Sequence, residues 1–531
     1  MKVLKLFIIL AAISISFSAK ALTMNELAGL SNEFEKKLSF KLPSKLKSNI
    51  ESIVYGSSHV GYFEASDWKK TQTGIDVSII PPSYMTKTEI IAKLSNGKSY
   101  LLQDDYFKSP LPPLFSNLKI EVEKGKLENS FYLLNGALPR RGLFNPNFSS
   151  LEPSFYKKNA NRFTYLMIVN KLGEVVWAHV PVIDGALFGS YLSAKRVGDG
   201  YYGIMFGKHS GYFEVAKYDG EVVRDFSSRD AAKPFAMHHD FETIGSDKLY
   251  AVGNKIEDLY KFTKNPKHKG KTFLTDTLIG INLKKGTSKE LKDFSSMFNP
   301  DITPYYTGDA PGDKKFAVWG KPKVDLDFLH INAVDYVKDK GVLVSFRNIS
   351  KVALIDSKFN HVKWTLGSQP TDTFYIEKPE DRFLQQHTPV MLSDDVLMVF
   401  DNAAKTKHSR AVKYYLNRKN GKASKIWEFK SAEQFYSKDR SSVAVLPSGN
   451  YGVFYVNPKV RGSKSSVIPH RDYYYEVDQK TGRELARMKI TYGVSSPGYR
   501  VLPISTIGRD KFLGERPNLN VSVKRQSKIR R

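Results

Sequence analysis

The sequence contains no cysteine among its 531 residues. This absence excludes disulfide bridges, thiolate metal ligands and cysteine nucleophiles, so any covalent chemistry must use another side chain. Long apolar runs are also scarce. The run at residues 6–15 is too short to anchor the chain, and no other stretch approaches the roughly 20 apolar residues that a membrane-spanning helix requires. We therefore expect no membrane span.

The start of the chain has the parts of a secretory signal peptide. Lys2 and Lys5 precede the apolar run, and residues 19–21 supply the small-x-small pattern that signal peptidase accepts. We expect residues 1–21 to be removed during export, which makes the mature protein a soluble periplasmic one.

Acidic side chains are too few to balance the basic ones. The formal net charge is +27, from 81 Lys and Arg against 54 Asp and Glu. A positive field of this kind attracts anionic substrates and anionic envelope surfaces. Nucleic acid is not expected as a partner, because the chain is predicted to leave the cytoplasm.

Strand-forming residues are abundant and recur with a period. Aromatic residues make up 13% of the chain, which favours strands. A hairpin pattern, in which two alternating strands flank a polar turn, occurs six times. The copies span residues 165–177, 213–226, 278–294, 352–364, 412–427 and 473–488. Most are preceded by a further strand pattern, at residues 202–206, 249–253, 342–346, 396–400 and 451–456.

The spacing of these hairpins predicts the fold class. Successive copies are roughly 50 to 75 residues apart, which is enough for a four-stranded blade and its loops. We predict an all-β protein with a six-bladed β-propeller over residues 151–515. Residues 22–150 lack the repeat and are predicted to form a β-rich, sandwich-like N-terminal domain, and residues 516–531 a basic tail. A pair of β-sandwiches is the alternative fold.

Three histidines occupy one equivalent point of the repeat. His239 and His387 each lie ten residues before the leucine of the following strand, and His330 lies thirteen before its own. Arg347 ends that strand in its repeat. Because the innermost strands of a propeller line its central channel, equivalent positions of consecutive blades converge near the axis. We expect these four side chains to share one pocket, whereas His238 should point to the opposite face of its strand.

Such a pocket suits a tetrahedral oxyanion. Arginine offers a rigid fork of donors, and each imidazole donates at least one N–H. Transfer of a sulfuryl group needs charge neutralisation on its oxygens and in-line positioning, much as phosphoryl transfer does. A neutral histidine can be the nucleophile, and positive neighbours help to keep it deprotonated.

Other chemistry remains open at this point. Three histidines can bind a metal such as zinc, although the sequence lacks a local pair such as His-x-x-x-His. Quinone-dependent dehydrogenases also use propellers, but the carboxylate constellation that they need for a metal is not evident. A propeller without catalytic activity could use the same cluster to bind anionic or sulfated envelope glycans.

Several segments around these residues resemble the bacterial arylsulfate sulfotransferases, periplasmic enzymes that work without the nucleotide sulfate donor. The segments begin with His-His-Asp-Phe-Glu and Phe-Leu-His-Ile-Asn and continue through Leu-Val-Ser-Phe-Arg to Gln-His and Phe-Asp-Asn. They lie at residues 238–242, 328–336, 343–347, 386–387 and 400–402.

The resemblance implies a homodimer of six-bladed propellers, each with an N-terminal β domain. It also implies a ping-pong transfer from phenolic sulfate donors to phenol acceptors through a sulfohistidine, without a metal or another cofactor. By position, His387 would take the sulfuryl group, and His330 and Arg347 would bind its oxygens. His239 would assist proton transfer, and Asn332 would line the substrate pocket.

The sequence departs from the family pattern directly after the predicted nucleophile. The family motif continues as Gln-His-Asp, whereas Thr388 and Pro389 follow His387 here. This change removes a carboxylate that could orient or charge the imidazole.

Overall fold

The computed structural model describes an all-β chain in which helices are short. The two α-helices in the described ranges are α3 (Ser44–Ser48) and α5 (Leu259–Thr263). No helix in these ranges combines the length and apolar character needed to cross a bilayer. The predicted signal peptide and the predicted tail at 516–531 lie outside the described residues. Those residues are 36–57, 61–79, 88–105, 118–139, 162–179, 182–183, 186–187, 192–197, 201–206, 212–217, 222–227, 236–304, 325–460, 471–492, 498–504 and 511–512.

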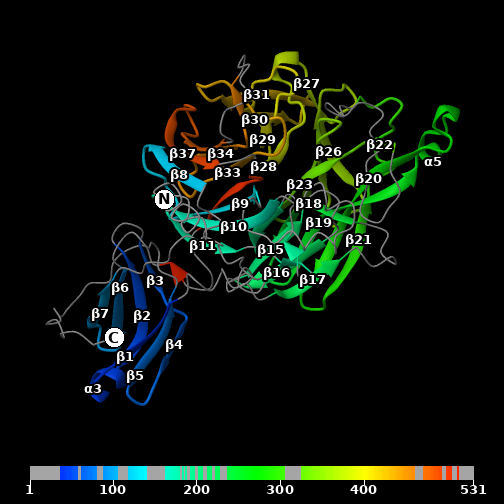
Figure 1. Ribbon diagram of the computed structural model, residues 1–531. Coiled ribbons are helices and arrows are strands. Elements are labelled where there is room, and N and C mark those ends of the chain that lie inside the picture. The colour runs from blue at the N-terminus through cyan, green and yellow to red at the C-terminus, as the bar shows by residue number, and fades with distance from the viewer. Residues whose placement is uncertain are drawn as a thin grey trace, which may run out of the picture.

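Two sheets at the N-terminal end form a separate layer beside the larger body, drawn in blue in Figure 1. One sheet joins β1 (Lys36–Lys41), β5 (Gly74–Ile79) and β4 (Asp67–Lys70). The other joins β39 (Lys511–Phe512), β3 (Gly61–Glu64), β2 (Ile50–Ser57), β6 (Thr88–Leu94) and β7 (Ser99–Asp105).

The rest of the described chain forms propeller-like groups of four antiparallel strands. The first three groups are β38 (Val501–Ile504), β9 (Phe131–Pro139), β10 (Arg162–Asn170) and β11 (Val175–His179); β14 (Leu192–Arg196), β15 (Tyr201–Phe206), β16 (Tyr212–Lys217) and β17 (Val222–Ser227); and β18 (Ala236–Ile244), β19 (Lys248–Asp258), β20 (Thr272–Asn282) and β21 (Thr287–Asp293).

The remaining strands continue the same arrangement. They are β23 (Ile331–Val337), β24 (Gly341–Phe346), β25 (Lys351–Ile355) and β26 (Val362–Gly367); β28 (His387–Ser393), β29 (Val396–Asp401), β30 (Arg410–Asn417) and β31 (Lys422–Phe429); and β33 (Ser442–Val445), β34 (Tyr451–Tyr455), β36 (Arg471–Val477) and β37 (Glu484–Tyr492). The short β27 (Phe374–Ile376) joins β26 to β31, so two groups form one nine-stranded sheet. All the hairpins predicted from the sequence are confirmed as antiparallel strand pairs.

The first strands of these groups contact one another in a ring. β14 contacts β18, and the contacts continue through β23, β28 and β33 to β38, while β9 returns to β14. Two of the four-stranded or larger sheets in the ring include a strand that is distant in sequence from the strand it pairs with. β38 pairs with β9, and β8 (Leu118–Lys124) pairs with β37. β8 and β9 therefore belong to the repeat region, although both fall within residues 22–150.

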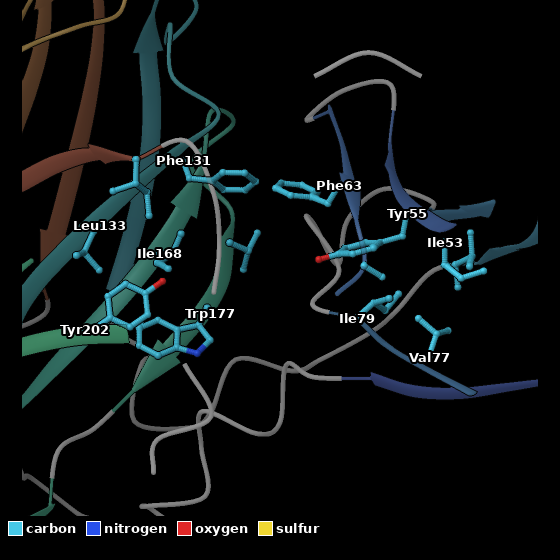
Figure 2. Close-up of a cluster of buried hydrophobic side chains, with 14 of the residues drawn as sticks. Ile53, Tyr55, Phe63, Val77, Ile79, Phe131, Leu133, Ile168, Trp177 and Tyr202 are labelled. Carbon is cyan, nitrogen blue, oxygen red and sulfur yellow. The ribbon is translucent and has the colours of Figure 1, made fainter. Parts of the chain in front are cut away.

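One apolar core connects the N-terminal sheets to this ring. The ring centroids of Phe63, on β3, and Phe131, on β9, are 5.3 Å apart, and Figure 2 shows the two side chains facing each other between the two bodies. On the side of the ring, the core continues to Trp177 and Tyr202, whose rings stack at 5.0 Å. The pairing of β39 with β3 adds a second connection.

Candidate active site

The three predicted histidines lie where inner strands begin, and they come from neighbouring strands. His239 is in β18, His330 directly precedes β23, and His387 is the first residue of β28. The rings of His239 and His330 lie 4.7 Å apart in an edge-to-face arrangement. His387 is joined to the same region through electrostatic interaction with Arg347.

Left-handed backbone conformations gather at these strand starts. The φ angle is +57° at His239, +54° at His330 and +48° at Thr388. It is also positive at Arg440 and Ser441, which directly precede β33. Such angles are uncommon for residues other than glycine, and they concentrate at functional sites, where surrounding structure must hold them. The backbone is thus bent at the point where each of these strands enters the ring.

The imidazole of His387 is held by an amide rather than by a carboxylate. Its Nδ1 lies 2.6 Å from Oδ1 of Asn402. The Nδ2 group of Asn402 donates to the carbonyls of Ser437 and Arg440, at 2.9 and 3.2 Å, which fixes the amide oxygen toward the ring. An amide oxygen can only accept, so Nδ1 must carry the proton and Nε2 the lone pair. The backbone N–H of Arg440 donates to that Nε2 at 3.1 Å.

The surroundings of His387 favour the neutral ring. Its side chain is 2% exposed, and burial lowers its pKa well below 6.5. The positive charge of Arg347 lowers the pKa further, while Asn402 and Asp439 oppose the shift. A neutral imidazole with a lone pair on Nε2 is the reactive form of a histidine nucleophile.

Arg347 is buried and keeps its positive charge in this region. Burial lowers its pKa, but a guanidinium titrates so far above neutrality that it stays charged. Its Nη1 donates to Oδ1 of Asn348 at 2.9 Å. Burial raises the pKa of Asp439, but the charges of Arg440 and Arg347 outweigh burial and bring it to about 2. The site therefore combines fixed positive charge with one ionised carboxylate.

His330 and His238 are each paired with a carboxylate. Nδ1 of His330 lies 2.6 Å from Oδ2 of Asp327, and Nε2 of His238 lies 2.9 Å from Oδ1 of Asp276. His238 also contacts His239, with the two Nδ1 atoms 2.5 Å apart. The expectation that His238 points to the opposite face is wrong. The positive φ at His239 and the register shift between Met237 and Phe241 break the alternation of β18.

Asn332 is fully buried and connects three inner strands. Its Nδ2 donates to the carbonyl of Gln386 at 2.7 Å, beside His387. The backbone carbonyl of Asn332 accepts from the Tyr499 hydroxyl at 3.2 Å and from Arg500 Nη2 at 3.3 Å. Its Oδ1 has no hydrogen-bond donor within the described part of the chain. Asn332 is thus bonded to the residue before His387, and its Oδ1 accepts no hydrogen bond from the described residues.

Asp240 is a second connection that the sequence did not indicate. Its carboxylate accepts from Nη1 of Arg500 at 2.8 Å and from the backbone N–H of Val334 at 3.0 Å, and it lies 3.2 Å from Nζ of Lys195. Burial raises the pKa of Asp240, but Arg500 and Lys195 outweigh burial and lower it. One buried carboxylate thereby ties together β14, β18, β23 and the residue before β38.

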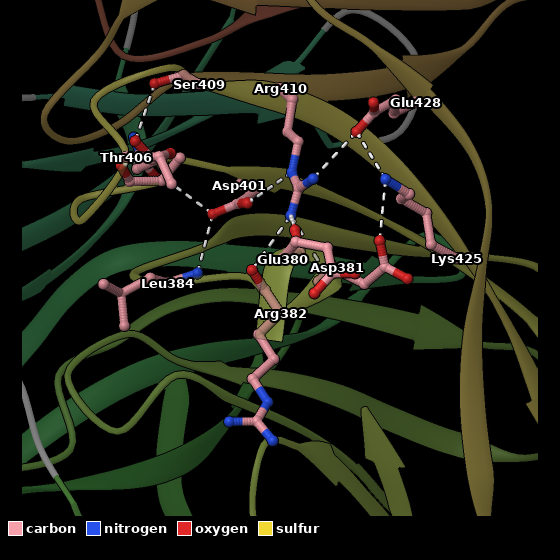
Figure 3. Close-up of polar contacts among 12 residues, drawn as sticks. Glu380, Asp381, Arg382, Leu384, Asp401, Thr406, Ser409, Arg410, Lys425 and Glu428 are labelled. Carbon is pink, nitrogen blue, oxygen red and sulfur yellow. Dashed lines mark hydrogen bonds and ion pairs between the residues drawn. The ribbon is translucent and has the colours of Figure 1, made fainter. Parts of the chain in front are cut away.

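An ion network supports the segment that leads to His387 (Figure 3). Nε of Arg410 lies 2.9 Å from Oδ2 of Asp401, whose Oδ1 accepts from the backbone N–H groups of Leu384 and Ala403. Nη2 of the same arginine donates to the carbonyls of Glu380, Asp381 and Arg382. The network holds the approach to His387 against the strand end that carries Asn402.

A cavity of about 450 Å³ adjoins the site. Its lining includes Thr388, which follows His387, Val334 in β23, and Arg500, which directly precedes β38. Asp335 also lines it, and burial with a smaller contribution from Glu242 raises the pKa of this carboxyl to about 6. Among the described residues, no three histidine or carboxylate side chains are grouped as a metal ion would require.

Likeness to solved structures is weak. A putative 6-phosphogluconolactonase from Bacteroides fragilis is 11% identical, covers 87% of this chain and 99% of its own, and has a TM-score of 0.32. BamB from Moraxella catarrhalis is 9% identical, covers 87% and 98%, and has a TM-score of 0.27. No curated protein matches the chain.

A family model identifies the family. The model described as arylsulfotransferase (ASST) matches residues 118–500, from the start of β8 to the residue before β38. This span contains all the predicted site residues together with Asn402, Asp276 and Arg500. The chain therefore belongs to the arylsulfotransferase family.

Proposed function

We propose that this protein transfers a sulfuryl group from a phenolic sulfate ester to a phenol by a ping-pong reaction in which His387 is transiently sulfated. Family membership supports aryl sulfotransferase activity in general. The observation that carries the finer proposal is the state of His387. It is buried and neutral, its Nδ1–H is held by Asn402, and its Nε2 lone pair lies in the field of Arg347.

In the first half-reaction, Nε2 of His387 attacks sulfur, the bond from sulfur to the phenolic oxygen breaks, and the phenolate leaves. The Arg440 N–H now bonded to Nε2 must give way to the new N–S bond. The ring becomes an imidazolium, and its Nδ1–H then makes a charge-assisted hydrogen bond to Asn402. Arg347 and His330 bind the sulfuryl oxygens, because fixed positive donors stabilise the charge that gathers there.

In the second half-reaction, an acceptor phenol loses its proton and its oxygen attacks the sulfur of sulfated His387. The N–S bond breaks and the neutral imidazole returns. His239 supplies the proton to the leaving phenolate and removes it from the acceptor. A phenol is a workable leaving group because its pKa of about 10 makes the phenolate accessible near neutral pH. Asn332, beside His387, lines the phenol site.

The same proposal covers the architecture and the location. We infer that the four-stranded groups are the six blades of a propeller, since their first strands contact one another in a ring. The N-terminal, sandwich-like domain then ends before β8, because β8 and β9 pair with β37 and β10. A periplasmic homodimer with a cleaved signal peptide rests on residues 1–21 and on the family resemblance.

The experiment is an intact-mass measurement on the purified protein mixed with 4-nitrophenyl sulfate and no acceptor. We expect a gain of about 80 Da, one SO₃ unit, in the unchanged protein and none in His387→Ala. His361→Ala is the matched control, because His361 is exposed and lies in the turn between β25 and β26.

The alternative is a propeller that binds sulfated ligands without catalysis. It predicts no adduct and no release of 4-nitrophenol from the unchanged protein. Release of 4-nitrophenol without an adduct, or an adduct retained in His387→Ala, would contradict the assignment of His387 as the nucleophile.

A further inference from the structure

His239 lies between two histidine–aspartate pairs. On one side, the His238 ring is 4.8 Å away at an interplanar angle of 84°, and Asp276 lies behind it. On the other side, the His330 ring is 4.7 Å away at 68°, and Asp327 lies behind it. Both carboxylates are at most 5% exposed. Five titratable groups thus follow one another through the interior of the ring.

The contact between His238 and His239 restricts where protons can be. The two Nδ1 atoms are 2.5 Å apart. We assign a single proton to this contact, because two lone pairs or two N–H groups facing each other would repel. The Nε2 of His238 lies 2.9 Å from Oδ1 of Asp276, and in the relay it bears a proton on that side. We assign Nε2 of His239 to the exchange of protons with the substrate.

This arrangement permits two states that differ by one proton. In the first, His238 is an imidazolium beside the Asp276 carboxylate and donates from Nδ1 to His239, whose Nε2 bears a proton. In the second, His238 is neutral, His239 carries the shared proton on Nδ1, and its Nε2 is a base. When Nε2 of His239 gives its proton to a phenolate, the Nδ1 proton moves from His238 to His239. His239 is neutral in both states.

We infer that His238 and Asp276 form a proton relay that acts through His239 and converts it between the acid for the leaving phenolate and the base for the acceptor phenol. The inference rests on the proposed function. His238 and Asp276 are positioning residues, since neither is placed against the substrate. Without His238, His239 would have to become an imidazolium to donate a proton and still be a neutral base afterwards. With the relay, the charge lies on His238 beside a carboxylate.

The relay predicts that its removal harms only poor leaving groups. 4-Nitrophenolate is stable at neutral pH and leaves without a proton, whereas the phenolate of phenyl sulfate needs one. We would measure the rate of the 80 Da adduct, about one SO₃ unit as above, from both donors in Asp276→Asn and in His238→Gln. The matched control is Thr275→Val, because Thr275 is buried next to Asp276 on β20 and its hydroxyl has no hydrogen-bond partner within the described part.

We expect both relay variants to form the adduct from 4-nitrophenyl sulfate within about threefold of the unchanged protein, and to form it from phenyl sulfate at least about 100-fold more slowly. Thr275→Val should react normally with both donors. An equal fall with both donors in Asp276→Asn and His238→Gln, or no fall with either, overturns the relay. Failure of the unchanged protein to form an adduct from 4-nitrophenyl sulfate overturns the proposed function instead, so the two failures are distinguishable.

Discussion

His387 and His330 each begin an inner strand of the ring, yet their Nδ1 atoms have different partners. His387 faces the amide oxygen of Asn402, whereas His330 faces the carboxylate of Asp327. The amide oxygen of Asn402 orients the imidazole and stabilises its protonated form through one hydrogen bond, whereas a carboxylate adds a full negative charge to that stabilisation. The two histidines therefore lie in different electrostatic surroundings, with an amide beside His387 and a carboxylate beside His330.

The same difference appears one strand outward. Phe346 and Phe400 occupy matching places, because each pairs with the first residue of its inner strand. Two residues further on, both repeats have an asparagine. Asn402 accepts from His387, whereas Asn348 accepts from Arg347 and donates to the carbonyl of Asp327. The same residue type thus occurs at the same place in both repeats, and its neighbours determine whether its amide oxygen binds His387 or Arg347.

Removing the amide should have the largest effect. In Asn402→Leu the imidazole of His387 loses the group that fixes its tautomer, and the rate of adduct formation from 4-nitrophenyl sulfate should fall on the order of 10³- to 10⁴-fold. Stopped-flow release of 4-nitrophenolate measures this rate. A variant within tenfold of the unchanged protein would show that Asn402 does not control the tautomer.

The ion network around Arg410 should contribute to the free energy of unfolding. Arg410→Met leaves Asp401 as an uncompensated buried charge, which typically costs about 3 to 5 kcal/mol in the free energy of unfolding. Urea denaturation checks this value. Arg418→Met is the matched control, since the ion pair of Arg418 with Asp395 is exposed and should contribute under about 1 kcal/mol. Equal losses in the two variants would contradict the role given to the Arg410 network.

Replacing the carboxylate beside His330 by an amide, the group that lies beside His387, should have a smaller effect on activity. In Asp327→Asn, His330 loses its carboxylate and with it the positive charge that we assign to sulfuryl binding. The value of kcat/KM for transfer from 4-nitrophenyl sulfate to phenol should fall about 100-fold, as when one charge-stabilising donor is removed. An unchanged kcat/KM would remove His330 from the set of groups that bind the sulfuryl oxygens.

The opposite substitution, which places a carboxylate beside His387, should have the smallest effect on the rate of adduct formation. This effect should depend on pH. Because the pKa of His387 lies well below 6.5, adduct formation in the unchanged protein should stay level as the pH falls from 8 to 6. In Asn402→Asp the new carboxylate raises this pKa, so protonation removes the lone pair as the pH falls. We expect rates close to those of the unchanged protein at pH 8 and a loss of about tenfold at pH 6. Parallel pH profiles would exclude this effect.

The sequence predicts the local part of this molecule well. Each hairpin joins neighbouring strands through a short turn, so its alternation and turn residues are visible within about 15 residues. The closures by β8 and β38 are not visible, because residues such as Val501 and Leu134 pair across most of the chain. The pairing of β8 with β37 is hidden for the same reason, since Ile120 and Ile490 are also far apart in the sequence.

The candidate site shows the same limit. The repeat register located His239, His330 and His387, but their partners come from other strands and loops. Asp276 reaches His238 from β20, with β19 between the two strands. The left-handed backbone at His239 also has no glycine to mark it, so the contact between adjacent histidines could not be inferred from strand alternation.

The closing strand β38 has a consequence for when the site comes into existence. Arg500, directly before β38, binds Asp240 and the carbonyl of Asn332, and Tyr499 binds the same carbonyl. A ribosome therefore completes the segment containing all three histidines more than a hundred residues before it supplies the two side chains that join their strands. A nascent chain that stops at residue 498 would contain His387 but lack the hydrogen bonds of Tyr499 and Arg500. The site can therefore assemble fully only after residues 499 and 500 have been synthesised.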